Sequence, residues 1–295
     1  MKDLPPDTGL SNGRRVRIAS AAFLLDDTAY GVEQRLERCA TYAADAAAAG
    51  ADVLCFPEAV VSAGLDPGHE ESAGGPVFTH FSALARRHGM HLIAPFLTRE
   101  GKTLYSRATL FQRDGGIAGC YDKVQPNGHE LRTITPGDTL PVFELDFGRV
   151  AVMLCMDIHF PEIARIYALK GAEIVFWPTM THGPTQESLL VQARARALDN
   201  SLCLVEANYA GAPPYAPYAG RHLPGNARII DHNGDILAQT GRRHGLAIAD
   251  VNLDEIRLTS QCVLLREPDH MREDLLSLYR RELYIRELQG IGGGS

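Results

Sequence analysis

Three side chains with complementary chemistry follow apolar stretches of this sequence: Glu58, Lys123 and Cys155. A cysteine thiolate is a strong nucleophile. A carboxylate beside it can take the thiol proton and later deliver that proton to an amine leaving group. A lysine ammonium stabilises both the thiolate and the oxyanion of a tetrahedral intermediate. Together these residue types predict nucleophilic acyl transfer away from an amine, provided that the fold brings them into one pocket.

Each of these residues also has a simpler structural explanation. Free cysteine is among the most buried residue types and commonly serves as a small hydrophobe. Glu58 would suit the cap of a helix, and Lys123 would suit a solvated loop, where most lysines lie. A catalytic role for Cys155 therefore depends on evidence from the rest of the chain.

The sequence around Cys155 predicts a strand that is followed by a turn and a helix. The run from Val150 to Cys155 is apolar and partly β-branched, which is typical of a strand buried on both faces of a sheet. After a break at residues 156–160, Pro161 and Glu162 suit the first turn of a helix. Cys155 would then lie at the carboxyl end of a buried strand, which is the edge where open α/β sheets bind ligands.

The remaining pattern alternates strands with helices and then adds hairpins. Helices are predicted at residues 31–50, 77–88, 161–170, 186–198 and 271–288. Strands are predicted at residues 17–23, 52–58, 91–97, 104–112, 117–122, 150–155, 173–178, 202–208, 226–231, 235–239 and 246–251. Asp114-Gly115 and Asn233-Gly234 mark hairpin turns. The pattern indicates an α/β layered fold in one domain, residues 16–288, with a loose lead-in at residues 1–15 and a flexible tail at residues 289–295.

Composition limits the kinds of partner. The 295 residues are 45% hydrophobic and 22% charged, with a net charge of -7 at pH 7, which argues against a nucleic-acid partner. No apolar run approaches the roughly 18 residues of a membrane helix, and the amino terminus lacks the apolar core of a signal peptide.

The six cysteines are scattered without CxxC pairs, which predicts reduced thiols in a cytoplasmic protein. The histidines are dispersed without HExxH spacing, so no metal site is expected.

Three blocks, in order, resemble those of the nitrilase superfamily of carbon–nitrogen hydrolases, on its amidase-like branch. Phe56-Pro57-Glu58, Tyr121-Asp122-Lys123 and residues 155–162 resemble its glutamate, lysine and cysteine blocks, and the similarity runs from about Val16 to Val251. The resemblance implies a four-layer α-β-β-α sandwich. It also implies a homodimer or larger homo-oligomer, joined through the helices near the cysteine, and no metal or organic cofactor.

The resemblance also implies a role for each residue of the set. Cys155 would attack the carbonyl carbon, and Glu58 would act as general base and then as general acid. Lys123 would hold the oxyanion together with the backbone N–H of Met156. A thioester would stay on Cys155 until water activated by Glu58 released the acid.

Four further residues are candidates for contacts with the substrate or with the lysine. The family has a second glutamate in the loop after the lysine, and Glu130 is the best match, within a long loop at residues 124–141. Loops of this length inside compact domains are usually functional. Trp177 and His182 lie at the end of the next predicted strand, where the family forms its substrate pocket, and His159 follows the cysteine. An exposed acid or an incidental loop histidine is the alternative explanation for Glu130 and for the two histidines.

Departures from the family pattern bear on the substrate. In true nitrilases the nucleophilic cysteine begins a Cys-Trp-Glu block, whereas this chain has Cys155-Met156-Asp157 at that place. The resemblance therefore favours an amide over a nitrile as the substrate. N-carbamoyl amino-acid hydrolases often place an arginine three or four residues beyond the cysteine, where this chain has Ile158 and His159. The sequence therefore predicts hydrolysis of a small non-peptide amide to an acid and ammonia. N-carbamoyl hydrolysis is the first alternative, nitrile hydrolysis is the second, and a catalytically silent scaffold of the same fold is the non-enzymatic alternative.

Overall fold

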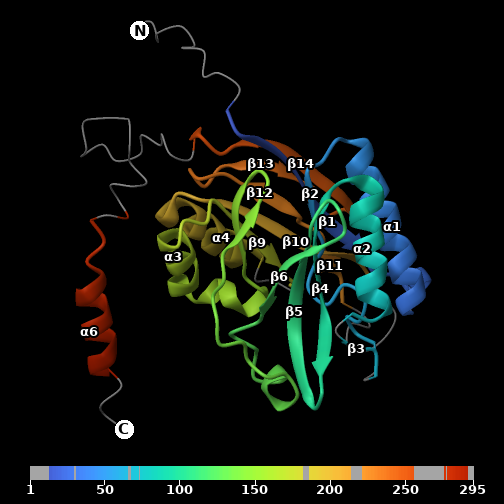
Figure 1. The fold of residues 1–295 in the computed structure, drawn as a ribbon, viewed down its shortest axis with the longest axis horizontal. Helices are drawn as coiled ribbons and strands as arrows, with labels where there is room; N and C mark the ends of the chain where they lie inside the picture. Colours follow the sequence, from blue (N-terminus) through green and yellow to red (C-terminus); the bar gives the residue numbers. More distant parts are fainter. Residues whose placement is uncertain are drawn as a thin grey trace, which may run out of the picture.

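The protein is a layered sandwich in which two β-sheets lie face to face between two pairs of helices (Figure 1). The computed structural model describes residues 13–29, 31–65, 68–72, 74–181, 186–213, 221–255, 276 and 278–291. Helices α1 (Val32–Ala48) and α2 (Pro76–His88) cover one sheet, and α3 (Pro161–Leu169) and α4 (Gln186–Asn200) cover the other. The predicted four-layer α-β-β-α arrangement is confirmed.

The two sheets share one continuous ladder of strands. The first sheet contains β1 (Arg15–Leu24), β2 (Val53–Cys55), β3 (Glu71–Ser72), β4 (His91–Glu100), β5 (Thr103–Phe111), β6 (Ile117–Asp122) and β14 (Gly245–Asn252). The second contains β7 (Phe143–Leu145), β8 (Gly148–Val152), β9 (Ile174–Pro178), β10 (Cys203–Gly211), β12 (Arg228–Ile230) and β13 (Ile236–Gln239), and β11 (Leu223–Pro224) pairs with β10. The sheets meet where the carboxyl ends of β1 and β10 pair in parallel, at Ala22–Leu24 and Asn208–Ala210.

The apolar core forms three layers because successive side chains of a strand point to opposite faces. In β1, Ile18 packs between the sheets, whereas Ala19 packs against α1 and α2. In β9, Phe176 packs between the sheets, whereas Trp177 packs towards α3 and α4. Burial on both faces explains why these strands read as continuous apolar runs rather than as alternating ones.

The predicted hairpin between β5 and β6 is confirmed, and its turn requires glycine. The backbone N–H of Gln112 donates to the carbonyl of Gly116 at 2.7 Å. Gly115 has φ +86°, and a side-chain carbon there would lie 2.7 Å from the carbonyl oxygen of Ser82. This hairpin carries β6 back across the sheet and delivers Lys123 to the site described below.

The structure differs from the predicted elements at two places that matter. β8 ends at Val152, so the strand predicted to reach Cys155 is three residues shorter, and a short 3-10 helix (Cys155–His159) follows it. The predicted helix 271–288 is observed as α6 (Arg281–Ile291), which continues into the tail expected to be flexible, because one glycine costs a helix only about 1 kcal/mol. Residues 1–12, 271–275 and 292–295 lie outside the described residues.

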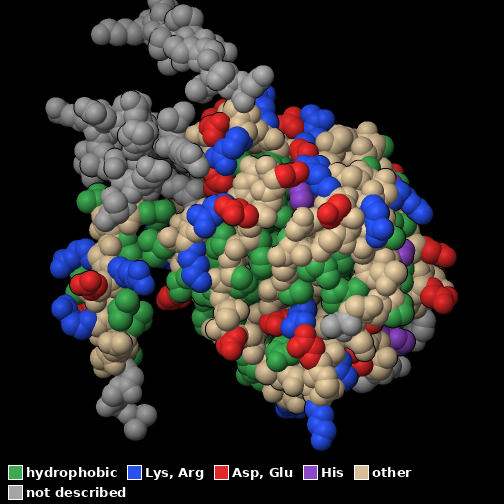
Figure 2. Space-filling view, in the orientation of Figure 1, with side chains coloured by type: hydrophobic (Ala, Val, Ile, Leu, Met, Phe, Trp, Pro, Cys, Tyr) green, Lys and Arg blue, Asp and Glu red, His purple; other side chains and the backbone are tan. Residues whose placement is uncertain are grey.

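Helix α6 stands beside α3 with a groove between them (Figure 1). The groove has a volume of 490 Å³, and Figure 2 shows hydrophobic side chains on α6 at this side of the molecule. The guanidinium of Arg165 on α3 lies 5.4 Å from the ring centre of Tyr279, just before α6.

The aromatic cluster between the first sheet and α2 predicts a large stability effect. Phe81 is fully buried and its ring centre lies 5.6 to 6.0 Å from those of Phe56, Phe96 and Phe111. Phe81→Ala should lower the free energy of unfolding by about 3–5 kcal/mol, through lost transfer energy and a cavity. Urea unfolding measures this, with the exposed Ile117→Thr as a control expected within about 0.5 kcal/mol of wild type. Equal effects of the two changes would contradict this packing.

Candidate active site

Glu58 is held in a pinned turn just after β2. The backbone N–H of Phe56 bonds to the carbonyl of Ile93, and the Tyr209 hydroxyl donates to the Glu58 carbonyl at 2.7 Å. Only 8% of the Glu58 side chain is exposed. These contacts leave the backbone of Glu58 little freedom, and its carboxylate lies among buried groups at the edge of the first sheet.

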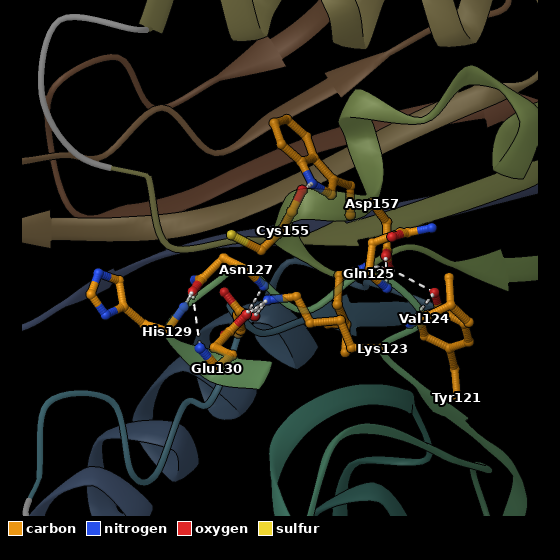
Figure 3. Close-up of polar contacts among 12 residues, drawn as sticks. Tyr121, Lys123, Val124, Gln125, Asn127, His129, Glu130, Cys155 and Asp157 are labelled. Atoms are coloured by element: carbon orange, nitrogen blue, oxygen red, sulfur yellow. Dashed lines mark hydrogen bonds and ion pairs between the residues drawn. The ribbon is translucent and has the colours of Figure 1, made fainter. Parts of the chain in front are cut away.

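Lys123 follows β6 directly and is a buried charge. Its backbone N–H donates to the carbonyl of Ser106 and its carbonyl accepts from Gly137, which fixes the start of the loop. The Lys123 side chain has no exposed surface, and Nζ donates to Glu58 Oε1 at 2.8 Å. The same Nζ lies 2.9 and 2.8 Å from the two carboxylate oxygens of Glu130 (Figure 3).

Glu130 reaches the lysine because the loop after β6 folds back on itself. The Asn127 side-chain oxygen accepts from the backbone N–H of Glu130, and the Glu130 carboxylate accepts from the N–H of Asn127 at 2.7 Å. This reciprocal pair fixes both the turn and the carboxylate. The structure therefore brings Glu58, Lys123 and Glu130 into one ionic cluster, and the loop at 124–141 supplies one of its members.

Cys155 lies on a sharp turn that opens the 3-10 helix and faces the Lys123–Glu130 contact (Figure 3). Its φ is +45°, in the left-handed region that costs a non-glycine residue roughly 1–2 kcal/mol. Two neighbours hold this turn: the indole N–H of Trp177 donates to the Cys155 carbonyl at 3.0 Å, and the Asp157 carboxylate accepts from the N–H of Leu154 at 2.7 Å. β8 ends early because the chain turns at Cys155, whose left-handed backbone cannot continue a strand.

Burial and mutual charge interactions shift the pKa values of Glu58, Lys123 and Cys155. Burial raises the pKa of the Glu58 carboxyl, against the attraction of the Lys123 ammonium. Burial alone would lower the pKa of Lys123, but the negative charge around it, from Glu58 first, outweighs burial and raises that pKa. Burial raises the pKa of the Cys155 thiol to about 12, the charge of Glu58 adds to this rise, and Lys123 opposes it.

These shifts define the resting charge state of the site. The lysine is an ammonium between two carboxyl groups, so a further negative charge on sulfur is disfavoured. The thiol therefore keeps its proton at neutral pH, and a nucleophilic attack by sulfur must be coupled to proton transfer to a nearby base. Glu58, whose pKa burial raises above its ordinary value, is the group beside the thiol that is suited to accept it.

Among the described residues, none of the other predicted site residues places a side chain in this ionic cluster. Met156 is the second residue of the 3-10 helix, where a backbone N–H has no partner within the helix. His159 ends the same helix with an exposed side chain, and the structure does not bring it into the cluster. His182 lies outside the described residues.

Trp177 packs behind the turn that carries Cys155. It is fully buried, and its indole supports the back of the Cys155 turn. Its position therefore favours a role in holding the nucleophile rather than the predicted contact with substrate. Trp177 lies at the end of a continuous apolar strand. Such a pattern does not distinguish a residue that lines a pocket from one that packs in the core.

Two residues that the sequence analysis did not assign to the site lie within it. Thr179 is fully buried, and its hydroxyl lowers the pKa of the Cys155 thiol. Asp157 is fully buried beneath the thiol turn and accepts hydrogen bonds from both sides of the site. The available signal was the acidic residue two positions after the cysteine in an otherwise apolar segment, because a buried acid needs partners.

Comparison with known proteins agrees with this architecture. Residues 16–261 match the model of the carbon–nitrogen hydrolase family. A probable nitrilase of Schizosaccharomyces pombe is 31% identical over 216 residues, covering 70% of this chain and 77% of that protein. The omega-amidase of Xenopus tropicalis is 27% identical over 285 residues, covering 91% of this chain and 99% of that protein. The structure of a cysteine-to-alanine mutant of the amidase from Nesterenkonia sp. AN1, in complex with butyramide, superposes with a TM-score of 0.76 at 25% identity, covering 92% and 96% of the two chains.

The chain therefore belongs to the carbon–nitrogen hydrolase family. Within the nitrilase superfamily it is amidase-like, as its sequence blocks indicate. Among the described residues, no helix combines the length and apolar character needed to cross a membrane.

The electrostatics of the cluster predict how Cys155 responds to the loss of its neighbour. Glu58→Gln removes a negative charge that raises the pKa of the thiol and leaves the Lys123 ammonium in place. The pKa of Cys155 should fall, so the thiolate fraction and the rate of alkylation by iodoacetamide at pH 8 should rise about tenfold. Peptide mass spectrometry resolves Cys155 from the other cysteines. Glu100→Gln, at the exposed end of β4, is the charge-matched control, and slower labelling of the Glu58 variant than of this control would contradict the assignment.

Proposed function

We propose that this protein hydrolyses a small linear amide to a carboxylic acid and ammonia through a thioester on Cys155. One observation carries the proposal: the buried Lys123 ammonium is bonded to Glu58 and Glu130 beside the Cys155 thiol, on turns that follow β6, β2 and β8. The membership of the chain in the carbon–nitrogen hydrolase family supports the same reaction class.

In the first half of the reaction the Cys155 sulfur attacks the amide carbonyl carbon while its proton passes to Glu58. The carbonyl oxygen becomes an oxyanion, which is stabilised by the Lys123 ammonium and the backbone N–H of Met156. An ammonium has three N–H groups, and its two contacts with Glu130 can share one of them, which leaves one for the oxyanion. The intermediate then collapses, Glu58 returns the proton to nitrogen, and ammonia leaves.

In the second half water replaces the amine. Glu58 is a carboxylate again and takes a proton from the water as it attacks the thioester carbonyl. The same oxyanion donors stabilise the second tetrahedral intermediate. When that intermediate collapses, the proton returns to sulfur, and the acid departs. Glu130 holds Lys123 in place throughout, and the chemistry calls for no metal or organic cofactor.

The choice of an amide rests on the residues after the nucleophile and on named relatives. Cys155-Met156-Asp157 departs from the Cys-Trp-Glu pattern of true nitrilases, and the relatives include an omega-amidase and an amidase in complex with butyramide. Ile158 is buried and His159 exposed where an arginine would grip the carboxylate of an N-carbamoyl amino acid. N-carbamoyl hydrolysis would release carbon dioxide with the ammonia, and a nitrilase would form acid from a nitrile without free amide.

A catalytically silent scaffold is the alternative outside enzymes. Against it stands the cost of burying Lys123 and Glu58, because desolvation of paired charges makes them a poor choice for stability alone. Release of no ammonia and formation of no acyl adduct on Cys155 with any amide of a broad panel would support the scaffold.

We also propose a cytoplasmic homodimer joined through α3 and α4. The support for the dimer is that Leu169, Val191 and Leu198 on these helices are large apolar side chains with 39%, 67% and 42% exposure. The support for the compartment is that Cys39, Cys55, Cys120, Cys155 and Cys203 are free.

The catalytic proposal predicts the outcome of two substitutions. Cys155→Ala removes the nucleophile and Lys123→Ala removes an oxyanion donor, so each should lower ammonia release from a panel of small amides by at least about a thousandfold. Cys120→Ala changes a partly buried thiol in β6 and is the matched control, expected to keep wild-type activity. Intact mass after rapid quenching should detect the acyl adduct on the wild type. Activity that survives Cys155→Ala would end the proposal.

The dimer proposal predicts a change in mass. Val191→Glu places a charge on the most exposed large apolar side chain of α4 and should convert dimers to monomers in sedimentation velocity. Leu237→Glu on β13, also an exposed apolar residue, is the control and should leave the mass unchanged. A wild-type protein that sediments as a monomer at micromolar concentration would contradict the proposal directly.

A further inference from the structure

Asp157 ties the turn that carries Cys155 to the loop that carries Lys123. Its carboxylate is fully buried and accepts from the Leu154 backbone N–H at 2.7 Å, on the cysteine side. On the lysine side it accepts from the Tyr121 hydroxyl at 2.6 Å and from the Gln125 N–H at 3.0 Å. Tyr121 and Gln125 lie two residues before and after Lys123, so the carboxylate spans the two turns that must meet (Figure 3).

All three of these partners are hydrogen-bond donors, which makes the carboxylate itself necessary. An ionised carboxylate accepts at both oxygens, whereas an amide of the same shape would turn an N–H₂ group towards at least one donor. The cost of such a mismatch is high inside a protein, because a buried donor left without an acceptor loses its water as well. An aspartate is therefore the side chain that satisfies this site.

The tyrosine partner is itself firmly placed. Tyr121 is 1% exposed, and its ring centre lies 6.5 Å from that of Tyr167, whose hydroxyl donates to the carbonyl of Val152 in β8. The groups that act on the ionisation of Asp157 come from both sides of the site: the Tyr121 hydroxyl and the Lys123 charge from the lysine side, and the Leu154 N–H from the cysteine side. Burial raises the pKa of Asp157 to about 6, and these contacts oppose the rise, so the carboxylate is ionised at neutral pH.

We propose that Asp157 is a positioning residue that sets the separation of the Cys155 thiol and the Lys123 ammonium, without itself touching the substrate. The inference rests on the proposed function, since the separation matters only if these two groups act on one reacting carbonyl. When the hydrogen bonds of Asp157 are lost, the Cys155 turn and the Lys123 loop shift apart. The Lys123 ammonium then stabilises the thiolate and the oxyanion less, so the chemical step slows while substrate binding is retained.

The test uses two variants and a matched control in the full chain. Asp157→Asn keeps the shape, removes the negative charge and replaces one acceptor oxygen with an N–H₂ donor, and Tyr121→Phe removes one hydrogen bond without any change of charge. Tyr42→Phe is the control, because Tyr42, in α1 and outside the site, is another buried tyrosine whose hydroxyl donates to a backbone carbonyl, that of Ala22, at 2.8 Å. Steady-state kinetics on the best amide of the panel are measured well below the unfolding temperature of each variant.

The proposal expects a loss in kcat of about a hundredfold for Asp157→Asn and about tenfold for Tyr121→Phe, with KM within about twofold of wild type. Alkylation of Cys155 by iodoacetamide at a fixed pH should slow in both variants, because the thiolate loses its ammonium. Tyr42→Phe should lower the unfolding temperature by a similar amount and leave kcat and the alkylation rate unchanged.

Several results would overturn the proposal. One is that Asp157→Asn and Tyr121→Phe both fold and keep the kcat and the Cys155 alkylation rate of the wild type, while Cys155→Ala is inactive. The hydrogen bonds of Asp157 would then have only a structural role, and the proposed function would stand. A rise in KM at constant kcat would instead assign Asp157 to substrate binding and equally refute positioning. If Asp157→Asn does not fold, Tyr121→Phe against Tyr42→Phe decides alone. Ammonia release by Cys155→Ala would remove the proposed function itself, which is a separate failure.

Discussion

The contact between the buried Lys123 ammonium and two carboxylates is the constraint on which the site depends. A lysine without exposed surface can remain charged only if opposite charges replace its water, and Glu58 and Glu130 do so at 2.8 to 2.9 Å. The glutamates come from the turn after β2 and from the loop after β6. The ion pairs of the Lys123 ammonium therefore hold together two segments that are far apart in sequence, and Cys155 lies beside this ionic cluster.

The layered fold makes this placement possible because both sheets are covered on both faces. β2 and β6 belong to one sheet and β8 to the other, and their ends meet at one edge of the sandwich. The apolar layer between the sheets, with Ile18 and Phe176 among its residues, sets the spacing of the two sheets. Cores pack as densely as organic crystals, so this spacing is rigid, and the remaining adjustment of the site falls to polar contacts such as those of Asp157.

The sequence predicted those parts of the structure whose signals are local. Continuous apolar runs identified the strands, Asp114-Gly115 identified the β5–β6 hairpin, and three ordered blocks identified the family. The sequence did not predict that β8 stops at Val152, because the positive φ of Cys155 is maintained by a contact from Trp177, a tertiary partner, as well as by the local contact of Asp157 with Leu154. The sequence indicated Asp157 only as a marker of substrate preference, because two of its three donors, Tyr121 and Gln125, come from a segment that only the fold brings near it.

The charge state of the cluster argues that the resting protein keeps its nucleophile inactive. With a pKa of about 12, the thiol does not ionise at neutral pH unless the negative charge is moved away from it. Transfer of the thiol proton to Glu58 leaves Lys123 facing one carboxylate and one developing anion instead of two carboxylates. The substrate carbonyl can take up that developing charge, because the carbonyl oxygen becomes the anion that Lys123 then faces. In the proposed reaction the carbonyl of a neutral substrate supplies the acceptor for this charge, so attack by sulfur would be coupled to substrate binding.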